Sequence, residues 1–492
     1  MKFVKIRFTD YFIPIVLFLI AFTWKVFYIN ARDICLDEPF TIFHAQDSIL
    51  NILKLPAQNE PNPPLFMLLL HFWIKLFGIS PFSVRTLPIL FNALTAVFLY
   101  LTGKRFFNFW AGITASGMFI LSTYHFYFGA DTRTYSMLSM ATAAALYFLF
   151  SLIKNPEERK YLIALIISNL VLVYGHYFGW LIVYMEIIVV LFHLKNREIL
   201  KNTGIAVLTT VILFIPMMVV MINQFFISKE STWVAPPMAY EYLHQLQSFL
   251  NAKKTLRIVA YLLGAGIIAG FVSKINREKM MDLTVLFLLW FLPYSFMFFI
   301  SYKIPMFTDR YILFNSIGFY LFIGAAISIL FHKIRILVPI LSIGMLILMG
   351  WYMETHDYAP RKVKMAANYI HSKMNTSSEM VIYAHWADLE LMYHFDLEIF
   401  KSVDNYEELL KENNIFRAWG VDDTKKHFEE NISQQIIFYQ NNTTAIDPEN
   451  ALFRYFEDNF ERTDSAHFEK GIVVSVFANR NIGDENMEKS GV

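Results

Sequence analysis

The chain has 492 residues, of which 56 % are hydrophobic, 17 % are aromatic and only 17 % are charged. Soluble globular proteins carry about 25 % charged residues, and the mean hydropathy here is +0.42. The sequence therefore predicts an integral membrane protein and excludes intrinsic disorder. Its 42 Lys and Arg side chains balance 41 Asp and Glu side chains, for a net charge of +1, so no polybasic nucleic-acid-binding protein is indicated. Cys35 is the only cysteine, which excludes an intramolecular disulfide and a cysteine-based metal cluster.

Eleven segments are predicted to cross the membrane, since a spanning helix needs about 20 mostly apolar residues. They are residues 11–29, 83–102, 109–128, 135–153, 160–177, 178–194, 204–223, 256–273, 282–301, 311–331 and 334–352. A further apolar stretch at residues 64–77 contains His71 and Lys75 and is shorter. Its length favours a juxtamembrane or re-entrant helix over a span.

Basic residues predict the orientation of these spans, because cytoplasmic loops collect Lys and Arg. With residues 64–77 left out of the count, six basic connections all fall on one side of the membrane. They contain Lys2, Lys5 and Arg7; Lys104 and Arg105; Lys154, Arg159 and Lys160; Lys195, Arg197 and Lys201; Lys274, Arg277 and Lys279; and Lys333 and Arg335. We expect a multi-pass protein of the inner (cytoplasmic) membrane with a cytoplasmic N-terminus and an extracytoplasmic C-terminal part.

The composition changes after Met353, where the chain becomes polar and charged and contains no further apolar span. Helical patterns alternate there with short β-rich runs, which is typical of a small α/β domain. The helical patterns lie at residues 361–373, 386–394 and 404–413, and the β-rich runs at 380–383, 435–439 and 472–477. We expect a transmembrane domain over residues 1–352, with its first outer loop at about 30–82, and an extracytoplasmic α/β domain over residues 353–492.

Two adjacent carboxylates, Asp37 and Glu38, follow the first predicted span in the first outer loop. A carboxylate at a membrane boundary is suited to general-base chemistry. The alternative is that the pair simply favours the N-terminal end of the dipole of an amphipathic helix over residues 40–55. Later in the same loop, Glu60 and Asn62 precede two prolines that open the short apolar helix. Both side chains can reach a polar site, although a helix-start signal explains most of this pattern.

The second predicted outer loop, residues 129–135, contains Asp131, Arg133 and Tyr135. Ionisable groups at membrane depth are costly and are therefore functional candidates. The alternative is an interfacial ion pair beside a tyrosine of the aromatic belt.

Further cations lie in or beside other outer loops. Arg310, next to Tyr311 and in the same loop as Lys303, offers a planar fork suited to phosphate. Arg85, at the outer start of the second span, allows the same interpretation, and for both arginines the alternative is snorkelling to the lipid headgroups. His176 can donate to a phosphate or bind a metal, although a lone interfacial histidine among tyrosines is more often structural. The sequence contains no paired metal-ligand motif and no nucleotide-binding signature.

In this order and on one side of the membrane, these motifs resemble the GT-C glycosyltransferases that use polyprenyl-phosphate-linked sugars. The resemblance is to the protein O-mannosyltransferase and lipid A aminoarabinose transferase group and to the related bacterial enzymes that decorate lipopolysaccharide core. It covers roughly residues 10–352 and rests on Asp37-Glu38, Asn62-Pro-Pro-Leu65, Arg85, Asp131-x-Arg133-x-Tyr135, His176-Tyr-Phe-Gly179 and Arg310-Tyr311. Two positions depart from the family pattern, because many relatives have His in place of Asn62 and Glu in place of Asp131.

The resemblance implies a GT-C-like helical membrane protein that transfers a hexosyl or pentosyl group with inversion. The donor would be an undecaprenyl- or dolichyl-phosphate sugar and the acceptor a lipid, glycan or protein on the outer face of the membrane. Asp37 is the expected general base, and Glu38 and Asp131 are further catalytic candidates. The predicted donor-binding residues are Arg85, Arg133, Tyr135, His176, Lys303, Arg310 and Tyr311. Some relatives bind a divalent metal near the acidic loop, for which Glu60 and His176 are the candidates in an incomplete ligand set.

Two other classes of function compete with an enzyme. A lipid-linked-sugar flippase or polysaccharide transporter would need polar residues along the middle of several spans, and Glu186 is the main example here. A sensor whose outer domain binds a ligand would need a cytoplasmic output domain, which the sequence lacks. Because the ionisable residues instead gather at one interface, the sequence favours the enzyme.

The predicted orientation can be tested by labelling single cysteines in a chain whose Cys35 has been replaced. A cysteine at Asn442 should react with a membrane-impermeant thiol reagent in intact cells, whereas one at Lys104 or Arg197 should react only after the cells are permeabilised. Labelling at Lys104 but not at Asn442 would reverse the orientation.

Overall fold

The computed structural model describes residues 9–58, 60–230, 234–273, 275–355, 362–383, 386–430, 433–443 and 446–480. The chain forms two compact units. The first comprises residues 1–29 and 49–356, and the second comprises residues 30–48 and 357–492. The predicted first outer loop is thus divided between the units, and its segment 30–48, which carries Asp37 and Glu38, folds with the C-terminal residues.

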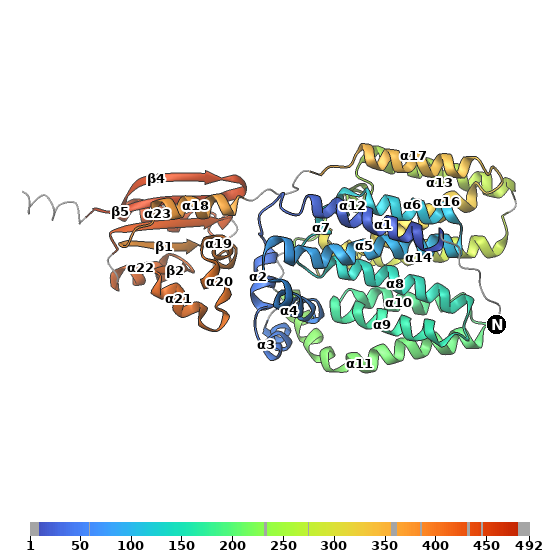
Figure 1. Cartoon of the computed structure of the whole chain (residues 1–492), viewed down its shortest axis with the longest axis horizontal. Coiled ribbons are helices and arrows are strands. Elements are labelled where there is room, and N and C mark those ends of the chain that lie inside the picture. Colours follow the sequence, from blue (N-terminus) through green and yellow to red (C-terminus); the bar gives the residue numbers. More distant parts are fainter. Residues whose placement is uncertain are drawn as a thin grey trace, which may run out of the picture. The chain divides into compact units, whose positions relative to one another are not determined.

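The first unit is a bundle of helices whose axes run side by side (Figure 1), and a helix occupies each of the eleven predicted spans. They are α1 (Thr9–Phe27), α5 (Pro81–Phe106), α6 (Phe109–Ile120) with α7 (Thr123–Phe128), α8 (Tyr135–Lys154), α9 (Arg159–Gly175), α10 (Gly179–Leu191), α11 (Arg197–Glu230), α13 (Lys253–Ser273), α14 (Arg277–Ile300), α15 (Asp309–Ile312) with α16 (Asn315–Leu330), and α17 (Leu337–Trp351). The apolar pattern therefore predicts where the helices lie.

By length and composition, four helices among the described residues can cross a membrane. They are Pro81–Phe106, Tyr135–Lys154, Arg197–Phe226 and Arg277–Ile300, each within a helix of at least 18 residues. Six further apolar helices have 10–17 residues: Tyr11–Phe27, Leu65–Phe77, Phe109–Ile120, Gly179–Leu191, Asn315–Leu330 and Leu337–Trp351. The number of eleven spans stays a prediction.

The centre of the first unit is the packing of α5, α6 and α16. Every residue of α16 is buried, as expected for a helix that is apolar on all sides. Helices α5 and α6 meet at Gly103 and Gly112, where a Cβ on Gly103 would lie 2.5 Å from the Cα of Gly112. The two backbones therefore touch, and any larger residue at Gly103 would force them apart.

Short helices lie at the end of this bundle that the sequence predicts to be outside. They are α3 (Ile49–Lys54), the 3₁₀ turn η1 (Leu55–Gln58), α4 (Leu65–Phe77) and α12 (Glu241–Phe249). Helix α4 begins directly after Pro64 and buries Phe66, Leu70 and His71 while Phe72 on its other face is exposed. It is thus the short amphipathic helix that the sequence predicts over residues 64–77.

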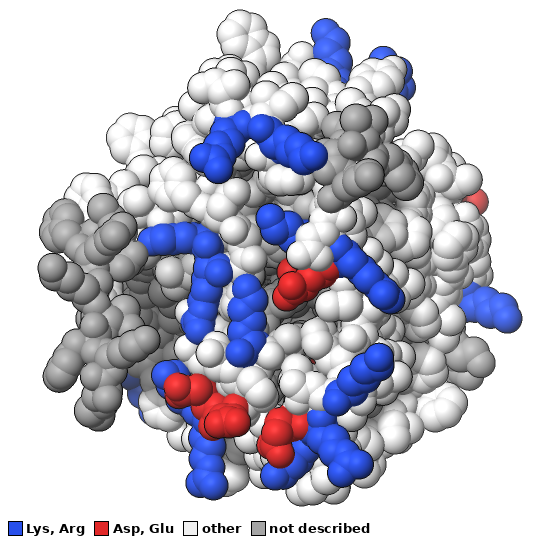
Figure 2. Space-filling view, turned by 90° about the vertical axis from the view of Figure 1, so that its right-hand side faces the viewer, with Lys and Arg blue, Asp and Glu red and all other residues white. Residues whose placement is uncertain are grey.

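Lysine and arginine side chains gather at the opposite end of the first unit (Figure 2). Exposed basic residues in or next to the connections at this end include Arg105, Lys154, Arg159, Lys160, Lys195, Arg197, Arg277, Lys279, Lys333 and Arg335. These are the connections predicted to be cytoplasmic, and they lie together as that prediction requires. Lys2, Lys5, Arg7 and Lys274 lie outside the described residues.

The second unit is a five-stranded sheet with helices. Its strands are β1 (Ser378–Tyr383), β2 (Ile415–Ala418), β3 (Gln435–Asn441), β4 (Phe460–Phe468) and β5 (Ile472–Asn479), in the order β2-β1-β3-β5-β4. Strand β1 is parallel to β2 and β3, and β5 is antiparallel to β3 and β4. The predicted β-rich runs correspond to β1, β3 and β5.

Helices connect these strands and add the N-terminal segment to the unit. They are α2 (Asp37–His44), α18 (Val363–Lys373), α19 (Asp388–Phe395), α20 (Leu397–Lys401), η2 (Val403–Asn405), α21 (Tyr406–Glu412), α22 (Val421–Glu430), α23 (Ala451–Asn459) and η4 (Glu469–Gly471). Helix α2, from the segment 30–48, packs on α19.

Candidate active site

The loop between α7 and α8 carries Asp131 and Arg133 and is held at both ends. The main-chain N–H of Arg133 donates to the carbonyl of Asp131 over 2.7 Å, which turns the chain sharply. The Thr134 hydroxyl donates to the carbonyl of Gly175 over 2.7 Å, and Gly175 is the last residue of α9. Arg133 precedes Thr134 in the sequence and His176 follows Gly175, so this hydrogen bond brings Arg133 and His176 near each other.

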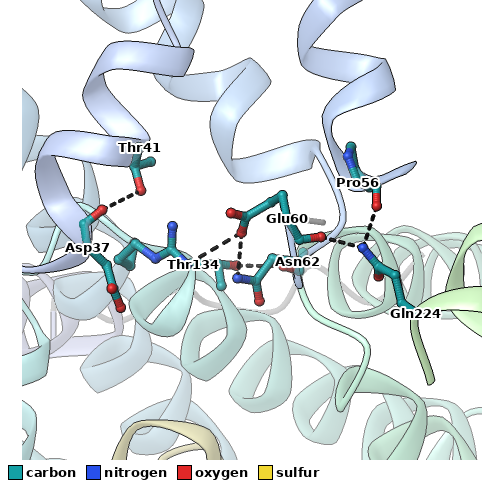
Figure 3. Close-up of polar contacts among 9 residues, drawn as sticks. Asp37, Thr41, Pro56, Glu60, Asn62, Thr134 and Gln224 are labelled. Atoms are coloured by element: carbon teal, nitrogen blue, oxygen red, sulfur yellow. Dashed lines mark hydrogen bonds and ion pairs between the residues drawn. The ribbon is translucent and has the colours of Figure 1, made fainter. Parts of the chain in front are cut away.

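A buried ion pair joins this loop to the first outer loop. Arg133 Nη2 lies 3.4 Å from Glu60 Oε1, and the two side chains are 9 % and 6 % exposed. Asn62 Nδ2 donates to the same carboxylate oxygen over 2.8 Å (Figure 3). Because a buried charge without a partner is costly, this pair ties Arg133 firmly to the start of α4.

The main chain around Glu60 is held as well. The side chain of Gln224, near the C-terminal end of α11, donates to the carbonyls of both Pro56 and Glu60 (Figure 3). Neither Gln224 nor Thr134 was predicted from the sequence as a site residue. In the sequence, each is a polar residue at the end of a mostly apolar helix. Such residues are too common for this pattern to identify a site residue.

Two further predicted outer loops, residues 174–178 and 301–311, meet through aromatic rings. The ring of His176 lies 5.8 Å from that of Tyr311, and Phe178 lies 5.6 Å from the same tyrosine ring. His176 Nδ1 accepts from the main-chain N–H of Phe178 over 3.1 Å. Its Nε2 is buried and has no hydrogen-bond partner among the described residues, so it remains available to a ligand.

Arg310 stands beside Tyr311 on the short helix α15. Its guanidinium carbon lies 5.8 Å from the centre of the Tyr311 ring. Asp309 Oδ1 accepts from the main-chain N–H of Arg310 over 2.8 Å, and the hydroxyl of Tyr124 donates to the carbonyl of Asp309. The backbone that carries Arg310 is therefore fixed, while the side chain is only half-buried.

Six predicted or adjacent residues thus come together at one end of the first unit, and we call them the polar cluster. Its members are Glu60, Asn62, Arg133, His176, Arg310 and Tyr311. The cluster combines two guanidinium groups and an unpartnered imidazole nitrogen with one carboxylate already held by Arg133. Guanidinium groups and an imidazole nitrogen are groups that bind anions.

Three other predicted residues have different surroundings. Arg85 is fully buried, and its Nη1 donates to the carbonyl of Ile29 over 2.8 Å. This gives a hydrogen-bond donor to a main-chain carbonyl just beyond the end of α1. Tyr135 is buried as the first residue of α8, with its ring 6.1 Å from that of Phe128. Lys303 is exposed in the turn after α14. Their roles toward a donor stay predictions.

Asp37 and Glu38 belong to the second unit and differ in their surroundings. Glu38 is 3 % exposed, and its carboxylate lies 3.8 Å from Arg32. Asp37 is half-buried, and its main-chain carbonyl accepts from the Thr41 hydroxyl over 3.0 Å (Figure 3). Asp37 is the more exposed of the two carboxylates and stays our candidate for the base.

Each of the two metal-ligand candidates has one of its two side-chain ligand atoms engaged by another group. Glu60 Oε1 receives Asn62 and Arg133, and His176 Nδ1 receives a main-chain N–H. Within the described part of the chain, no three His, Cys, Asp or Glu side chains are placed to hold a metal ion. The donor set therefore does not fit a metal centre, and the chemistry below uses the chain's own side chains.

Comparison with known proteins adds a family model and several solved structures. The model of the dolichyl-phosphate-mannose-protein mannosyltransferases matches residues 61–222, and no curated protein sequence matches the chain. The crystal structure of ArnT from Cupriavidus metallidurans in the apo state matches with a TM-score of 0.59 and 12 % identity, over 94 % of this chain and 97 % of that chain.

Two structures of related complexes match as well. ArnT from Cupriavidus metallidurans bound to undecaprenyl phosphate has a TM-score of 0.58 and 12 % identity, over 95 % of this chain and 98 % of that chain. The archaeal oligosaccharyltransferase AglB from Archaeoglobus fulgidus, in complex with an inhibitory peptide and a dolichol-phosphate, has a TM-score of 0.50 and 9 % identity, over 97 % of this chain and 75 % of that chain.

The predicted fold class is confirmed, because these structures share the GT-C fold over nearly all of the chain. The predicted enzyme class is confirmed together with it, since the family model over residues 61–222 describes glycosyltransferases. The chain thus has the fold of the GT-C glycosyltransferases, and residues 61–222 match a family of mannosyltransferases. The matched range contains three members of the polar cluster, Asn62, Arg133 and His176, and begins one residue after Glu60. Arg310 and Tyr311 lie beyond it.

The buried ion pair yields a prediction that separates stability from function. Glu60→Gln removes a counter-charge from the buried Arg133, so the free energy of unfolding should fall by about 3 kcal/mol. Glu60→Gln/Arg133→Gln removes both charges and should recover much of that stability in thermal unfolding of the purified protein. Transfer should stay lost in the double variant. A double variant no more stable than Glu60→Gln would mean that the ion pair is not what stabilises this region.

Arg310 is predicted to hold the phosphate of the donor. Arg310→Ala should lower kcat and raise the donor KM, because phosphate charge grows as the glycosyl bond breaks. Arg310→Lys should restore only part of the activity, because an ammonium group lacks the planar fork. Arg257→Ala, at an exposed arginine of α13, is the matched control. If Arg310→Ala turned over donor like this control, Arg310 would be a membrane-interface anchor.

Proposed function

We propose that this enzyme moves a sugar, with inversion, from a polyprenyl-phosphate carrier to a lipid, glycan or protein acceptor on the outer face of the cytoplasmic membrane. The polar cluster is the observation that carries the proposal. It gathers Arg133, Arg310 and the open nitrogen of His176 at one end of an apolar bundle. The opposite end carries the basic connections predicted to be cytoplasmic (Figure 2).

The nature of the donor follows from where these groups lie. A lipid-linked sugar keeps its chain in the bilayer and presents its phosphate at the interface, where the cluster offers cations. As the bond between the sugar and the phosphate breaks, negative charge grows on the leaving oxygen, and Arg310 with His176 can stabilise it. The undecaprenyl phosphate bound by ArnT and the dolichol-phosphate bound by AglB support a polyprenyl-phosphate donor here.

The acceptor needs a base, for which Asp37 is our candidate. An acceptor hydroxyl or amine attacks the anomeric carbon from the face opposite the phosphate, and its proton passes to the Asp37 carboxylate. The new bond forms as the carbon–oxygen bond to the phosphate breaks, which releases the polyprenyl phosphate and inverts the configuration. Arg133, held by Glu60, would keep its positive charge fixed beside the reacting groups throughout.

The alternative of a flippase lacks comparable support. Its main sequence signal, Glu186 in α10, is buried, and its Oε2 accepts from Asn169 Nδ2 of α9 over 2.9 Å. The carboxylate thus joins two neighbouring helices, as intramembrane polar residues often do. The matched family and structures are glycosyltransferases, which favours the enzyme.

The proposed activity can be tested in proteoliposomes that contain the purified protein, a radiolabelled polyprenyl-phosphate sugar and an acceptor membrane fraction from a deletion strain. Transfer should require the protein and should release polyprenyl phosphate in equal amount. Movement of intact donor across the bilayer without formation of product would support the flippase instead.

The role of Asp37 gives a sharper test. Asp37→Asn keeps the shape of the side chain but removes the base, so transfer should fall at least about 10²-fold while expression and membrane insertion are retained. Asp47→Asn, at a half-buried carboxylate of the same segment, is the matched control and should remain active. If Asp37→Asn kept activity within about threefold, far from the effect of a lost base, Asp37 would be excluded from the mechanism.

A further inference from the structure

The turn that presents Asp37 has a backbone conformation that is unusual for its residue. Leu36 has φ 60° and ψ −123°, and the main-chain N–H of Glu38 donates to the carbonyl of Cys35 over 3.3 Å. This is the geometry of a type II′ turn, whose first central position favours glycine. A leucine held there is strained, and such strain persists only where the surroundings impose it.

The surroundings that impose this conformation come from the C-terminal part of the second unit. Glu390, on α19, is 3 % exposed, and its Oε1 accepts from the main-chain N–H of Leu36 over 3.2 Å. Its other oxygen, Oε2, accepts from Asn441 Nδ2 at the end of β3 over 2.8 Å. One buried carboxylate therefore links the strained turn to the sheet.

A second residue of α19 holds the chain just before the turn. His394 lies one helical turn after Glu390 and donates from Nε2 to the carbonyl of Ile34 over 2.8 Å. Residues four apart lie on the same face of a helix. Glu390 and His394 can therefore both bond the main chain of the segment that precedes α2, at Leu36 and Ile34. The segment is thus held on both sides of Cys35.

Further contacts fix the rest of the segment 30–48 to the same unit. The ring of Phe43, on α2, lies 5.6 Å from that of Phe400 and 4.9 Å from that of Tyr406. Asp33 Oδ2 accepts from the main-chain N–H of Lys364 over 3.0 Å. The helix that begins at Asp37 is therefore anchored at both ends, and the orientation of Asp37 depends on the C-terminal residues.

We propose that Glu390 is a positioning residue for the reaction, which holds the strained turn at Leu36 and thereby orients the carboxylate of Asp37. The inference rests on the proposed role of Asp37 as the base. It gives the C-terminal α/β domain a catalytic task, because the sheet and α19 hold the base from residues more than 350 positions away in the sequence. The contacts do not require that the domain bind any ligand of its own.

The purified full-length enzyme in proteoliposomes can test this with four variants. Glu390→Ala removes both acceptors, and the turn should relax, so kcat should fall about 10²-fold, as is typical of a misplacement near 1 Å, while the donor KM changes less than about twofold because phosphate binding uses other residues. Asn441→Asp sets two carboxylates face to face and should be strongly impaired, whereas in Glu390→Gln the amide of Asn441 can turn its oxygen toward the new amide and the loss of kcat should be smaller.

The double variant Glu390→Gln/Asn441→Asp provides the decisive comparison. It exchanges donor and acceptor between the two side chains, so that Leu36 N–H still meets an oxygen and the pair is again complementary. Its kcat should recover to within about threefold of wild type, well above that of Asn441→Asp, as expected for residues that act as a unit. The kcat is taken per mole of folded, membrane-inserted enzyme, so that a loss of folding lowers the yield of protein and leaves kcat unchanged.

Glu379→Gln is the matched control for stability. Glu379 is another buried carboxylate of the second unit, bonded to His427 and Ser433, and it is not part of the turn. It should lower the thermal stability as Glu390→Gln does but leave kcat unchanged at low temperature. If Glu390→Ala kept wild-type kcat while Asp37→Asn was inactive, this inference would fail and the proposed function would stand. If Asp37→Asn were active, the role of Asp37 would fail first.

Discussion

The high cost of placing charge in an apolar bundle is the constraint on which the rest of this structure depends. In the first unit the buried guanidinium of Arg133 is matched by Glu60, that of Arg85 by a main-chain carbonyl, and the carboxylate of Glu186 by an amide. These three buried charges thus have partners that keep them in place. Arg310 differs from them in being only half-buried, at the end of the bundle, where a ligand can reach it. Burial therefore distinguishes charges that hold the fold from a charge that can act on a substrate.

The helical part of this fold could be predicted because its signal is local. A run of about 20 apolar residues specifies a helix with little help from the rest of the chain, and each predicted run is helical in the structure. The short helix α4 was predicted for the same reason, since its two prolines and its length are visible in the sequence. The strands β2 and β4 were not predicted. Strand β2 has only four residues, and β4 is mostly polar and partly exposed, so neither carries the apolar pattern of a buried strand.

The site could be predicted only in part, because its partners are distant in the sequence. Asp131 and Arg133 were recognised as unusual at membrane depth, and His176 and Arg310 as candidates for binding phosphate. Glu60 was considered as a metal ligand, whereas the structure pairs it with Arg133. No spacing rule connects residues that are more than 70 positions apart. The sequence also did not predict that residues 30–48 belong to the second unit. This packing depends on contacts of Leu36, Phe43 and Glu390 that exist only after folding.

Asp37 and Glu38 show how one acidic dipeptide can divide its tasks. Glu38 is buried against Arg32 and anchors the start of α2, and Leu36 on the other side is fixed by Glu390. Both neighbours of Asp37 thus have their polar groups engaged in holding the turn, while Asp37 itself is less buried than Glu38. A general base must keep its orientation while it exchanges a proton, and a rigid backbone with a more accessible carboxylate meets both needs. The strained backbone at Leu36 then orients the Asp37 carboxylate while its neighbour Glu38 stays buried. The hydrogen bonds of Glu390 to Leu36 and to Asn441 of the sheet stabilise this conformation.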